Sequence, residues 1–483
     1  MKIFVVASEC VPFAKTGGLA DVVGALPKAL VARGHEVTVF LPRYRSTAPG
    51  PVVFPSLSIP IGRSLAFPDI QDGGTIEGVR YFFLDFPLYF DRAELYGGGN
   101  VDYPDNAERF TLFCRAALEF LKRTGAPDLI HCHDWQSALI APLLKTVHGD
   151  DPQLGHVPVI FTLHNLAYQG LFPPAVVDRL MLPASLFSIS GLEFYGRVNF
   201  MKGGLVFADF VTTVSPRYAQ EIQTPEFGHG LDGVIRHRAD SVAGILNGVD
   251  YTEWSPETDK HIAAHYSADN LDAKKACKKD LLQQFGLPAA GLRKPVLGIV
   301  SRFVTQKGFD LMEEVAEELM ARDLLIVALG TGEARFEEMF RRLAAQYPKK
   351  VGVRVAYDEV LAHKIEAGSD LFLMPSRWEP CGLNQIYSLR YGTVPLVRAT
   401  GGLDDTVEAF DPATGRGTGF KFSRYTGAAF MECLLQALAV FRRQPDAWRQ
   451  LMKNGMAQDF SWGRSAAEYE ALFQRLVKNA RSG

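Results

Sequence analysis

The sequence has no long hydrophobic run. The apolar stretch at residues 3–7 ends at Ser8 and Glu9, too soon for the hydrophobic region of a secretory signal. No stretch approaches the roughly 18 consecutive apolar residues of a membrane-spanning helix. We therefore expect neither a cleaved signal nor a membrane span, and we expect a cytoplasmic protein without a membrane partner.

Paired cysteines and an excess of one charge are also missing. Six cysteines are scattered over 483 residues without a CxxC pair, so free thiols in a reducing compartment are expected. Lys and Arg number 51 against 54 Asp and Glu, a net charge of -3. This balance argues against a nucleic-acid partner, because no general basic field is present. An anionic ligand would have to meet local cations.

The sequence does contain short apolar runs that alternate with helical patterns, which is typical of parallel sheets covered by helices. In the first half, the predicted strands are residues 3–7, 37–41, 128–132, 157–163, 210–214 and 242–246. In the second half, they are residues 296–300, 324–329, 351–355, 371–374 and 394–397. Length and pattern together predict two large α/β domains.

A charged segment separates the two series of strands. Residues 251–294 contain two Lys-Lys pairs followed by prolines, which is typical of a domain boundary. We predict an N-terminal domain at residues 1–250 and a C-terminal domain at residues 251–455 that includes this linker. The last helical pattern, in residues 456–483, either caps the second domain or crosses back to the first.

A Thr-Gly-Gly-Leu sequence occurs twice, at residues 16–19 after the first predicted strand and at residues 400–403 after a late one. A Gly-rich turn that opens a helix presents backbone N–H groups and the positive end of the helix dipole to an anion. Neither loop has Walker A or GxGxxG spacing, which disfavours ATP hydrolysis and NAD chemistry. The glycines either permit a tight turn or hold a phosphorylated ligand, and the matched pair favours the ligand.

Cations and a carboxylate follow two strands of the second domain. Arg302 and Lys307 come after the strand at residues 296–300, and a guanidinium fork with an ammonium suits a leaving diphosphate. Glu379 lies in the sequence at residues 375–383, which opens a helix, where it would accept hydrogen bonds from a sugar. Solvated loop cations and a Glu stabilised by the helix dipole are the alternative interpretations.

Polar residues also end two strands of the first domain. The His-Cys-His run at residues 131–133 has metal-ligand residue types, but alternate strand residues face opposite ways and no second cluster lies nearby, so no zinc site is expected. Asp134 and His164 are better suited to bind sugar or acceptor hydroxyls, against the alternative that they are satisfied strand-end polar groups. Tyr96, beside the Gly run at residues 97–99 of a predicted mobile loop, is a candidate for stacking on a sugar.

In their order along nearly the whole chain, these motifs closely resemble those of bacterial glycogen synthases and plant starch synthases. The resemblance rests on KTGGLADV at residues 15–22, HDW at 133–135, TLHN at 162–165, NGVD at 247–250, SR at 301–302, QKG at 306–308, PSRWEPCGL at 375–383 and TGGL at 400–403. It implies an α/β fold of GT-B type, with two Rossmann-like doubly wound domains facing a deep cleft. It also implies transfer of glucose from ADP-glucose to the non-reducing end of an α-1,4-glucan such as glycogen, with retention and without cofactor or essential metal.

The resemblance also implies roles for individual residues. The implied catalytic residues are Glu379, Arg302, Lys307 and His164. The implied donor-binding residues are Lys15, Gly17, Gly18, Asn247, Tyr357, Cys381, Gly382, Leu383, Thr400 and Gly401. Tyr357 would stack on adenine, Tyr96 and Asp134 are the expected acceptor or sugar contacts, and no residue is expected to bind a metal.

Retaining glycosidases use two carboxylates that flank the scissile bond. Only Glu379 is well placed here, so we expect front-face attack by the glucan hydroxyl, with the leaving phosphate assisting its deprotonation. Three positions depart from the family pattern: Asp404 stands where Ala is usual, Ala399 where a basic residue is usual and Asn384 where Thr is usual. The added carboxylate and the lost cation put the diphosphate affinity and the nucleotide preference in doubt.

Two alternative functions stay open. A related GT-B glucosyltransferase that uses UDP-glucose would share the architecture, although the Lys-Thr-Gly-Gly-Leu start is not expected there. A catalytically inactive sugar-binding homologue is the second alternative, and the presence of the cations and the carboxylate together argues against it. A glycogen phosphorylase is disfavoured, because that family is much longer and needs lysine-bound pyridoxal phosphate. The sequence makes no prediction of the oligomeric state.

Overall fold

The computed structural model describes residues 1–98 and 101–482, which form two compact units. Unit 1 contains residues 1–214 and 219–248 and the C-terminal segment from Trp462 onward. Unit 2 contains residues 215–218 and 249–461. The sequence-based limits were placed after residues 250 and 455. In the structure the C-terminal segment belongs to unit 1.

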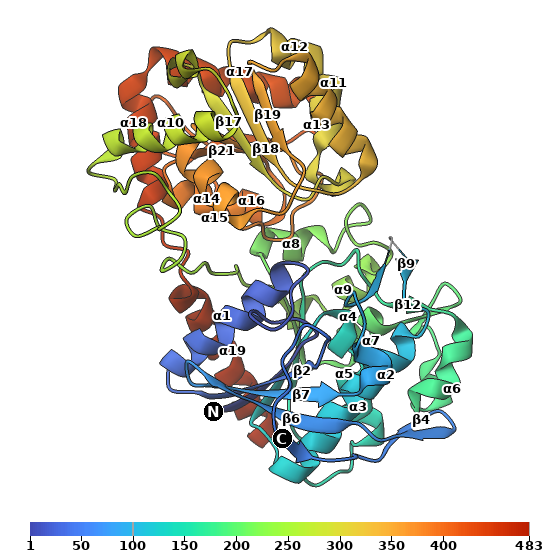
Figure 1. Cartoon of the computed structure of the whole chain (residues 1–483). Coiled ribbons are helices and arrows are strands. Elements are labelled where there is room, and N and C mark those ends of the chain that lie inside the picture. Colours follow the sequence, from blue (N-terminus) through green and yellow to red (C-terminus); the bar gives the residue numbers. More distant parts are fainter. Residues whose placement is uncertain (99–100, 483) are drawn as a thin grey trace. The chain divides into compact units, whose positions relative to one another are not determined.

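Unit 1 is built on one nine-stranded sheet. Its strands are β1 (Lys2–Val6), β2 (Glu36–Pro42), β3 (Val52–Phe54), β6 (Asp69–Ile76), β7 (Val79–Asp85), β10 (Leu129–His133), β11 (Val159–Leu163), β15 (Phe210–Thr213) and β16 (Val242–Gly244). They lie in the order β16-β15-β11-β10-β1-β2-β7-β6-β3. Figure 1 labels β2, β7 and β6, which are neighbours in this order. The strands from β16 to β7 are parallel, and β6 and β3 are antiparallel additions.

Helices cover both faces of this sheet because successive strand residues point to opposite sides. Ile3 and Val5 pack with the helix α1 (Gly18–Ala32) and with the helix α19 (Trp462–Ser482), which comes from the C-terminal segment. Phe4 points the other way and stacks on Phe120 of the helix α3 (Asn106–Thr124), with ring centroids 5.9 Å apart. The helices on the two faces thus fix β1, and with it the start of the loop that follows this strand.

Unit 2 has a six-stranded, fully parallel sheet. Its strands are β17 (Val296–Val300), β18 (Leu325–Leu329), β19 (Val351–Arg354), β20 (Leu371–Met374), β21 (Val394–Arg398) and β22 (Phe420–Phe422). Their order is β19-β18-β17-β20-β21-β22. The chain moves outward from β17 to β19 and then returns to add β20 on the other side of β17, which is the strand order of a Rossmann fold.

Unit 2 also has an apolar core on each face of its sheet. One core includes side chains of α11 (Phe309–Glu314), α12 (Ala316–Ala321), α13 (Ala334–Gln346), α17 (Gly427–Arg443) and α18 (Pro445–Met456). The other includes α10 (Lys274–Gln284), α14 (Glu359–Gly368) and α16 (Gly401–Thr406). Leu297 and Ile299 of β17 enter the first core and Val296 enters the second. Since both faces are covered, the strands are mostly apolar, and the charged residues Arg354, Arg398 and Lys421 lie in β19, β21 and β22.

Shorter elements complete the two units. The remaining strands are β4 (Ile59–Ile61), β5 (Ser64–Ala66), β8 (Gly97–Gly98), β9 (Val101–Asp102), β12 (Leu171–Phe172), β13 (Glu193–Phe194) and β14 (Arg197–Asn199). The remaining helices are α2 (Pro87–Phe90), α4 (Asp134–Ser137), α5 (Ile140–Pro142), α6 (Val177–Leu180), α7 (Phe200–Phe207), α8 (Pro216–Glu221), α9 (Asp232–His237) and α15 (Asn384–Arg390).

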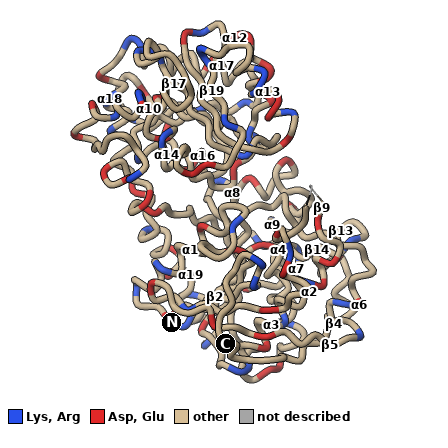
Figure 2. Tube along the Cα trace, in the orientation of Figure 1, with Lys and Arg blue, Asp and Glu red and all other residues tan. Residues whose placement is uncertain are grey.

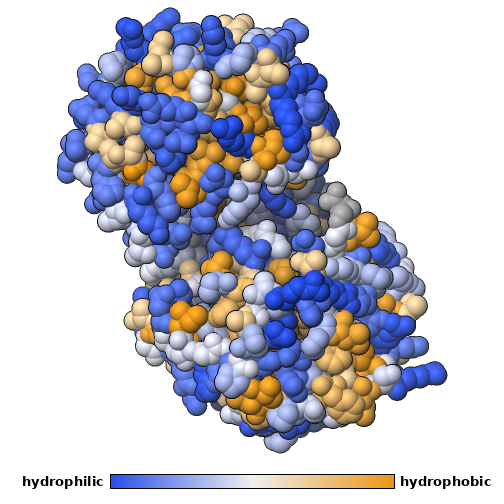
Figure 3. All heavy atoms as spheres, viewed as in Figure 1, coloured by the Kyte–Doolittle hydropathy of each residue, from blue (hydrophilic) through white to orange (hydrophobic). Residues whose placement is uncertain are grey.

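The surface carries both signs of charge. Figure 2 shows Lys and Arg interleaved with Asp and Glu along both units. On the face seen in Figure 3, apolar residues form groups separated by hydrophilic ones. Among the described residues, no helix combines the length and the apolar character needed to span a bilayer. All six cysteines are buried, and none forms a disulfide with another described residue.

Candidate active site

The predicted site residues lie mainly in loops at the carboxyl ends of strands. In unit 1, Lys15 lies in the loop after β1 and Asp134 follows β10, the strand beside β1. In unit 2, Lys307 lies in the loop after β17 and Glu379 follows β20, the strand beside β17. The strand order reverses between the members of each pair, and open α/β sheets bind ligands at such switch points. Each unit therefore has a candidate ligand site of its own.

Glu9 organises the first of these loops. Its side chain is buried, and its carboxylate accepts hydrogen bonds from the Thr16 amide at 2.5 Å, the Thr16 hydroxyl at 2.6 Å and the Gly17 amide at 3.2 Å. The Tyr96 hydroxyl donates to the same carboxylate at 2.6 Å. Sequence reasoning missed Glu9. The available signal was its position, two residues beyond an apolar strand and ahead of the Gly-rich loop.

The glycines of this loop leave its backbone open. Gly17 precedes α1 and Gly18 is its first residue, and a Cβ added to either would meet no atom within 4 Å. Neither glycine has a positive φ, so neither the backbone conformation nor the packing of unit 1 requires glycine. The Lys15 ammonium lies beside the loop, 2.7 Å from the Asp21 carboxylate. The tight-turn interpretation does not account for these glycines, and the open backbone leaves room for a ligand.

The glycines of the second loop have a different role. Gly401 has a φ of +44°, and a Cβ there would collide with the carbonyl oxygen of Glu379. A Cβ at Gly402 would collide with the carbonyl oxygen of Cys381, and the Gly402 amide donates to the Glu379 carbonyl at 3.1 Å. Thr400 is buried and precedes α16. The two Thr-Gly-Gly-Leu loops are therefore not equivalent, because the second packs on the backbone of the Glu379 turn.

Lys307 and Glu379 form the central ion pair of unit 2. The Lys307 ammonium lies 2.6 Å from the Glu379 carboxylate, which also accepts a hydrogen bond from the Ser376 hydroxyl at 3.1 Å. The side chains are 18% and 6% exposed, respectively. The Arg377 amide donates to the Gln306 carbonyl at 2.8 Å and so joins the two motifs. The predicted cation and carboxylate are thus in direct contact.

The other predicted residues near this ion pair are Arg302, in the loop after β17, and Cys381, Gly382 and Leu383, in the turn after β20. Arg302 has an exposed side chain and forms no ion pair within the described part of the chain. Gly382 has a φ of +73°, where glycine is favoured. The Gln385 side-chain amide donates to the carbonyls of Cys381 and Gly382, at 3.0 and 2.9 Å, and Leu383 leads into α15. This network shapes the turn after β20.

Tyr357 lies after β19, between the sheet and α14. Its side chain is 78% exposed. The next residue, Asp358, caps α14, because its carboxylate accepts a hydrogen bond from the Leu361 amide at 2.9 Å. The ring is therefore held on a capped turn while its faces stay accessible, as stacking on a base requires.

Three histidines, His131 and His133, which are buried, and His164, which is partly exposed, lie at the ends of β10 and β11 beside the unit 1 site. His133 Nδ1 and His164 Nε2 are 3.0 Å apart, and His131 Nε2 bonds the Thr162 hydroxyl at 2.6 Å. Burial lowers the pKa of His131 and of His164 to about 3. The Asp134 carboxylate accepts a hydrogen bond from the His164 amide at 2.7 Å, yet burial raises the pKa of Asp134 to about 7. His164 is therefore neutral and suited to hydrogen bonding, not to charge pairing.

Two further predicted residues of unit 1 differ in their surroundings. Asn247 is 6% exposed, and its side-chain oxygen has no hydrogen-bond partner among the described residues, as expected of a group that meets a ligand. The Tyr96 ring lies near Phe110 and Trp135, and its hydroxyl is held by Glu9. Tyr96 precedes the β8–β9 hairpin, and Gly99 lies outside the described residues. The structure thus gives Tyr96 a contact with the Lys15 loop.

The three residues that depart from the family pattern, Asp404, Asn384 and Ala399, each make a contact within the protein. The Asp404 carboxylate lies 2.7 Å from the Lys421 ammonium and 3.6 Å from the Arg217 guanidinium. The Asn384 side chain donates to the Val300 carbonyl at 2.5 Å. The added negative charge is balanced by two cations. Ala399 lacks a charge, and its amide completes the sheet contact with β22.

Comparisons with known proteins agree on one family. Residues 2–237 match the family described as starch synthase catalytic domain, and residues 287–439 match glycosyl transferases group 1. A glycogen synthase of Koribacter versatilis is 58% identical, over 98% of each chain. A glycogen synthase of Anaeromyxobacter dehalogenans is 49% identical, over 99% of each chain.

Solved structures share the fold. The catalytic domain of Starch Synthase IV from Arabidopsis thaliana, bound to ADP and acarbose, superposes with a TM-score of 0.89 at 36% identity, over 99% of each chain. A sucrose-phosphate synthase of Thermosynechococcus elongatus superposes with a TM-score of 0.60 at 20% identity and shows the fold alone. Fold and matches together define a glycosyltransferase of GT-B type. The chain belongs to the glycogen synthase family. The predicted fold class and enzyme class are confirmed.

Proposed function

We propose that the chain transfers glucose from ADP-glucose to the non-reducing end of an α-1,4-glucan such as glycogen, with retention at the anomeric carbon. The Lys307–Glu379 pair carries this proposal, because it brings a cation for a departing diphosphate against a carboxylate that can stabilise a cationic sugar. Membership of the glycogen synthase family supports the reaction, and the ADP bound to the Arabidopsis relative supports the nucleotide.

The donor would be held along its length. Tyr357 would stack on adenine, and Arg302 and Lys307 would bind the diphosphate with a guanidinium fork and an ammonium. Lys15 and the open backbone at Gly17 and Gly18 would meet the phosphates from unit 1, at the start of α1. Because these groups belong to two units, the proposal requires the units to close on the donor across the expected cleft.

The glucose would be bound by neutral groups and one carboxylate. Glu379 and the turn at residues 381–383 would meet the ring hydroxyls, and Thr400 and Gly401 would support that turn. Asn247 and the neutral His164 would add hydrogen bonds from unit 1, because the lowered pKa of His164 removes its charge. Asp134 and Tyr96 keep their proposed place next to the acceptor.

The chemical step would be a front-face substitution. The bond from the anomeric carbon to the phosphate oxygen breaks, and the acceptor hydroxyl oxygen forms a bond to the same face of that carbon. The departing phosphate oxygen takes the hydroxyl proton, so that ADP leaves. Arg302 and Lys307 stabilise the charge that grows on the diphosphate, and Glu379 stabilises the positive charge on the sugar.

The proposal needs no nucleic acid, membrane, cofactor or metal ion in the transfer step. It places the enzyme in the cytoplasm, in keeping with six buried cysteines that form no disulfide among the described residues. Because Asp404 is balanced by Lys421 and Arg217, its added charge does not argue against ADP-glucose.

A donor panel tests the proposal. Purified protein is incubated with glycogen and either ADP-glucose or UDP-glucose, and nucleotide release and chain growth are both measured. We expect chain growth with ADP-glucose at a kcat/KM well above that with UDP-glucose. Preference for UDP-glucose would support the alternative transferase, and failure with both donors would support an inactive sugar-binding homologue.

A further inference from the structure

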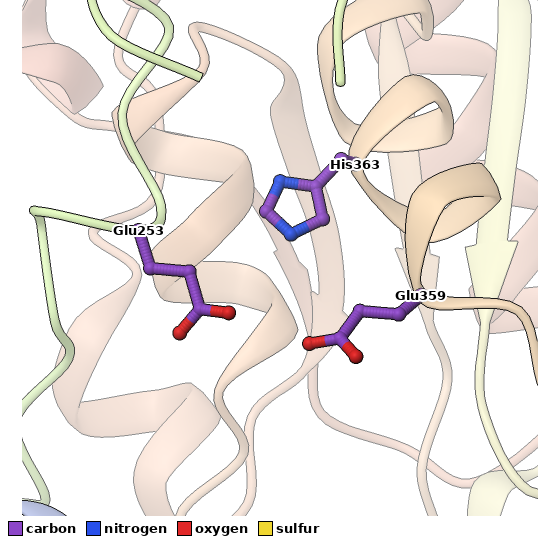
Figure 4. Close-up of side chains that lie close together, drawn as sticks. All are labelled: Glu253, Glu359 and His363. Carbon is purple, nitrogen blue, oxygen red and sulfur yellow. The ribbon is translucent and has the colours of Figure 1, made fainter. Parts of the chain in front are cut away.

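Glu253, Glu359 and His363 lie together in unit 2 and have no part in the proposed transfer reaction. One potential ligand atom from each residue lies within 4.8 Å of the other two. Glu359 is the first residue of α14 and His363 is one turn later, so both project from the same face of the helix. Glu253 comes from the segment that begins unit 2. Figure 4 shows both carboxylates and one ring nitrogen of His363 facing the same space.

His363 has an unexplained nitrogen. The residue is 1% exposed, and its Nδ1 lies 2.8 Å from the Asp259 carboxylate. Because a carboxylate accepts, Nδ1 carries the proton and Nε2 has a lone pair. Nε2 is buried and has no hydrogen-bond partner among the described residues. Leaving a buried polar atom unpaired costs about 1–3 kcal/mol, so this one requires an explanation.

A stacked aromatic ring and a hydrogen-bonded carboxylate fix the orientation of the His363 ring, and so the direction of the Nε2 lone pair. The Trp254 ring stacks on the His363 ring, with centroids 3.7 Å apart and planes 12° from parallel, and on the Tyr387 ring at 3.9 Å. The Tyr391 hydroxyl donates to Asp259 at 2.5 Å and so holds the carboxylate behind His363. Metal-ligating histidines commonly donate their second N–H to such a carboxylate, which fixes the tautomer and the ring orientation.

We propose that Glu253, Glu359 and His363 bind a divalent transition-metal cation, with Zn²⁺ as the best fit. The ligands are His363 Nε2 and one oxygen from each glutamate, and water completes the coordination. Zn–N and Zn–O bonds are about 2.0–2.2 Å long and the geometry is tetrahedral, so ligand atoms on one ion are about 3.3–3.6 Å apart. The three groups here lie within 4.8 Å of one another, and both glutamates are exposed, so their side chains are free to rotate toward that spacing.

The ligand types select the class of cation. Mg²⁺ and Ca²⁺ prefer oxygen ligands alone, whereas an imidazole nitrogen favours Zn²⁺ and its neighbours in the first transition row. The two carboxylates balance the charge of the ion. Bound there, the ion ties the segment that carries Glu253 to the first turn of α14. Its role is structural, because none of the three residues belongs to the proposed donor site.

Calorimetry and thermal unfolding test this site in the tag-free, full-length protein after removal of metals with a chelator. We expect one Zn²⁺ per chain and a Tm that rises with Zn²⁺ but not with the same concentration of Mg²⁺. Glu253→Gln and Glu359→Gln each remove one ligand charge at an exposed position and should weaken Zn²⁺ binding at least tenfold. Glu338→Gln is the control, because it makes the same change at an exposed position on α13.

Three outcomes would overturn the proposal: no Zn²⁺ binding by the wild-type protein, binding that neither glutamate variant weakens, or equal binding of Mg²⁺. Co²⁺ provides a second readout, because an imidazole ligand changes its visible absorption. That signal should appear at the same Co²⁺ concentration in the wild-type protein and the Glu338→Gln variant and require at least tenfold more Co²⁺ in Glu359→Gln. Transfer activity is not used, so failure of this site and failure of the proposed function are separate results.

Discussion

The Lys307–Glu379 ion pair allows a prediction about nucleotide affinity. The ammonium and the carboxylate are 2.6 Å apart, so a diphosphate that approaches Lys307 must compete with Glu379. A hydrogen bond to a charged group contributes about 1.5–3 kcal/mol. Glu379→Gln keeps the shape of the side chain but removes its charge, which releases part of this energy. We expect ADP to bind the variant at least as tightly as the wild type and up to about tenfold more tightly, which corresponds to about 1.4 kcal/mol.

Lys307→Ala should have the opposite effect. It removes the cation for the diphosphate and leaves the Glu379 carboxylate, 6% exposed, without its ammonium. Breaking a fully buried pair costs about 3–5 kcal/mol, and the 18% exposure of Lys307 reduces that to about 2–3 kcal/mol. We expect ADP affinity to fall about tenfold or more, together with the free energy of unfolding.

Calorimetric titration with ADP and urea denaturation measure both effects. Lys275→Ala is the control, because Lys275 is 79% exposed in its ion pair with Asp272 and should change unfolding by less than about 0.5 kcal/mol. A loss of ADP affinity in Glu379→Gln, or unchanged ADP affinity and stability in Lys307→Ala, would show that the two side chains do not compete in this way.

Three further predictions follow from individual environments. Gly18→Ala should leave Tm unchanged or raised, since Ala is favoured by about 1 kcal/mol in a helix, yet raise the KM for the donor; Gly402→Ala should lower Tm instead, because its Cβ collides with backbone. Tyr357→Ala should weaken ADP binding in calorimetry by about 1–3 kcal/mol while Tyr357→Phe does not, and an unchanged affinity would remove the stacking role. The pKa of His131 is lowered to about 3, so the stability that this residue contributes is present above the unfolded pKa of about 6.5 and is lost as the pH falls. Between pH 7 and pH 5, the free energy of unfolding from urea denaturation should fall by about 2 kcal/mol less in His131→Asn than in the wild type, and equal losses would contradict this.

Much of the sheet architecture could be predicted because the parallel strands are buried on both faces. The strand predicted at residues 296–300 has the bounds of β17, and its five residues are apolar or glycine. β6 was missed because Asp72 and two glycines interrupt its alternation at a bulge. β22 was missed because it has only three residues, too few for a period to show.

The sequence motifs predict that the site residues lie at strand ends, but they do not predict contacts between residues that are far apart in the sequence. Glu9 reaches Tyr96 across 87 positions, and Lys307 reaches Glu379 across 72. Spacing alone could not show that one pair of glycines is open and the other is packed, because both have the same local sequence. The charge balance of Asp404 in α16 likewise depends on Lys421, which β22 supplies.

The initial rate of labelled glucose transfer from ADP-glucose to glycogen shows whether this chain transfers glucose through Glu379 and Lys307. Wild-type protein and Glu379→Gln are measured side by side, with folding checked by circular dichroism. We expect sustained chain growth by the wild type and a kcat about 100- to 1000-fold lower in the variant, the usual cost of removing a group that stabilises transition-state charge. Equal rates in the two proteins, or no transfer by the wild type, would contradict it.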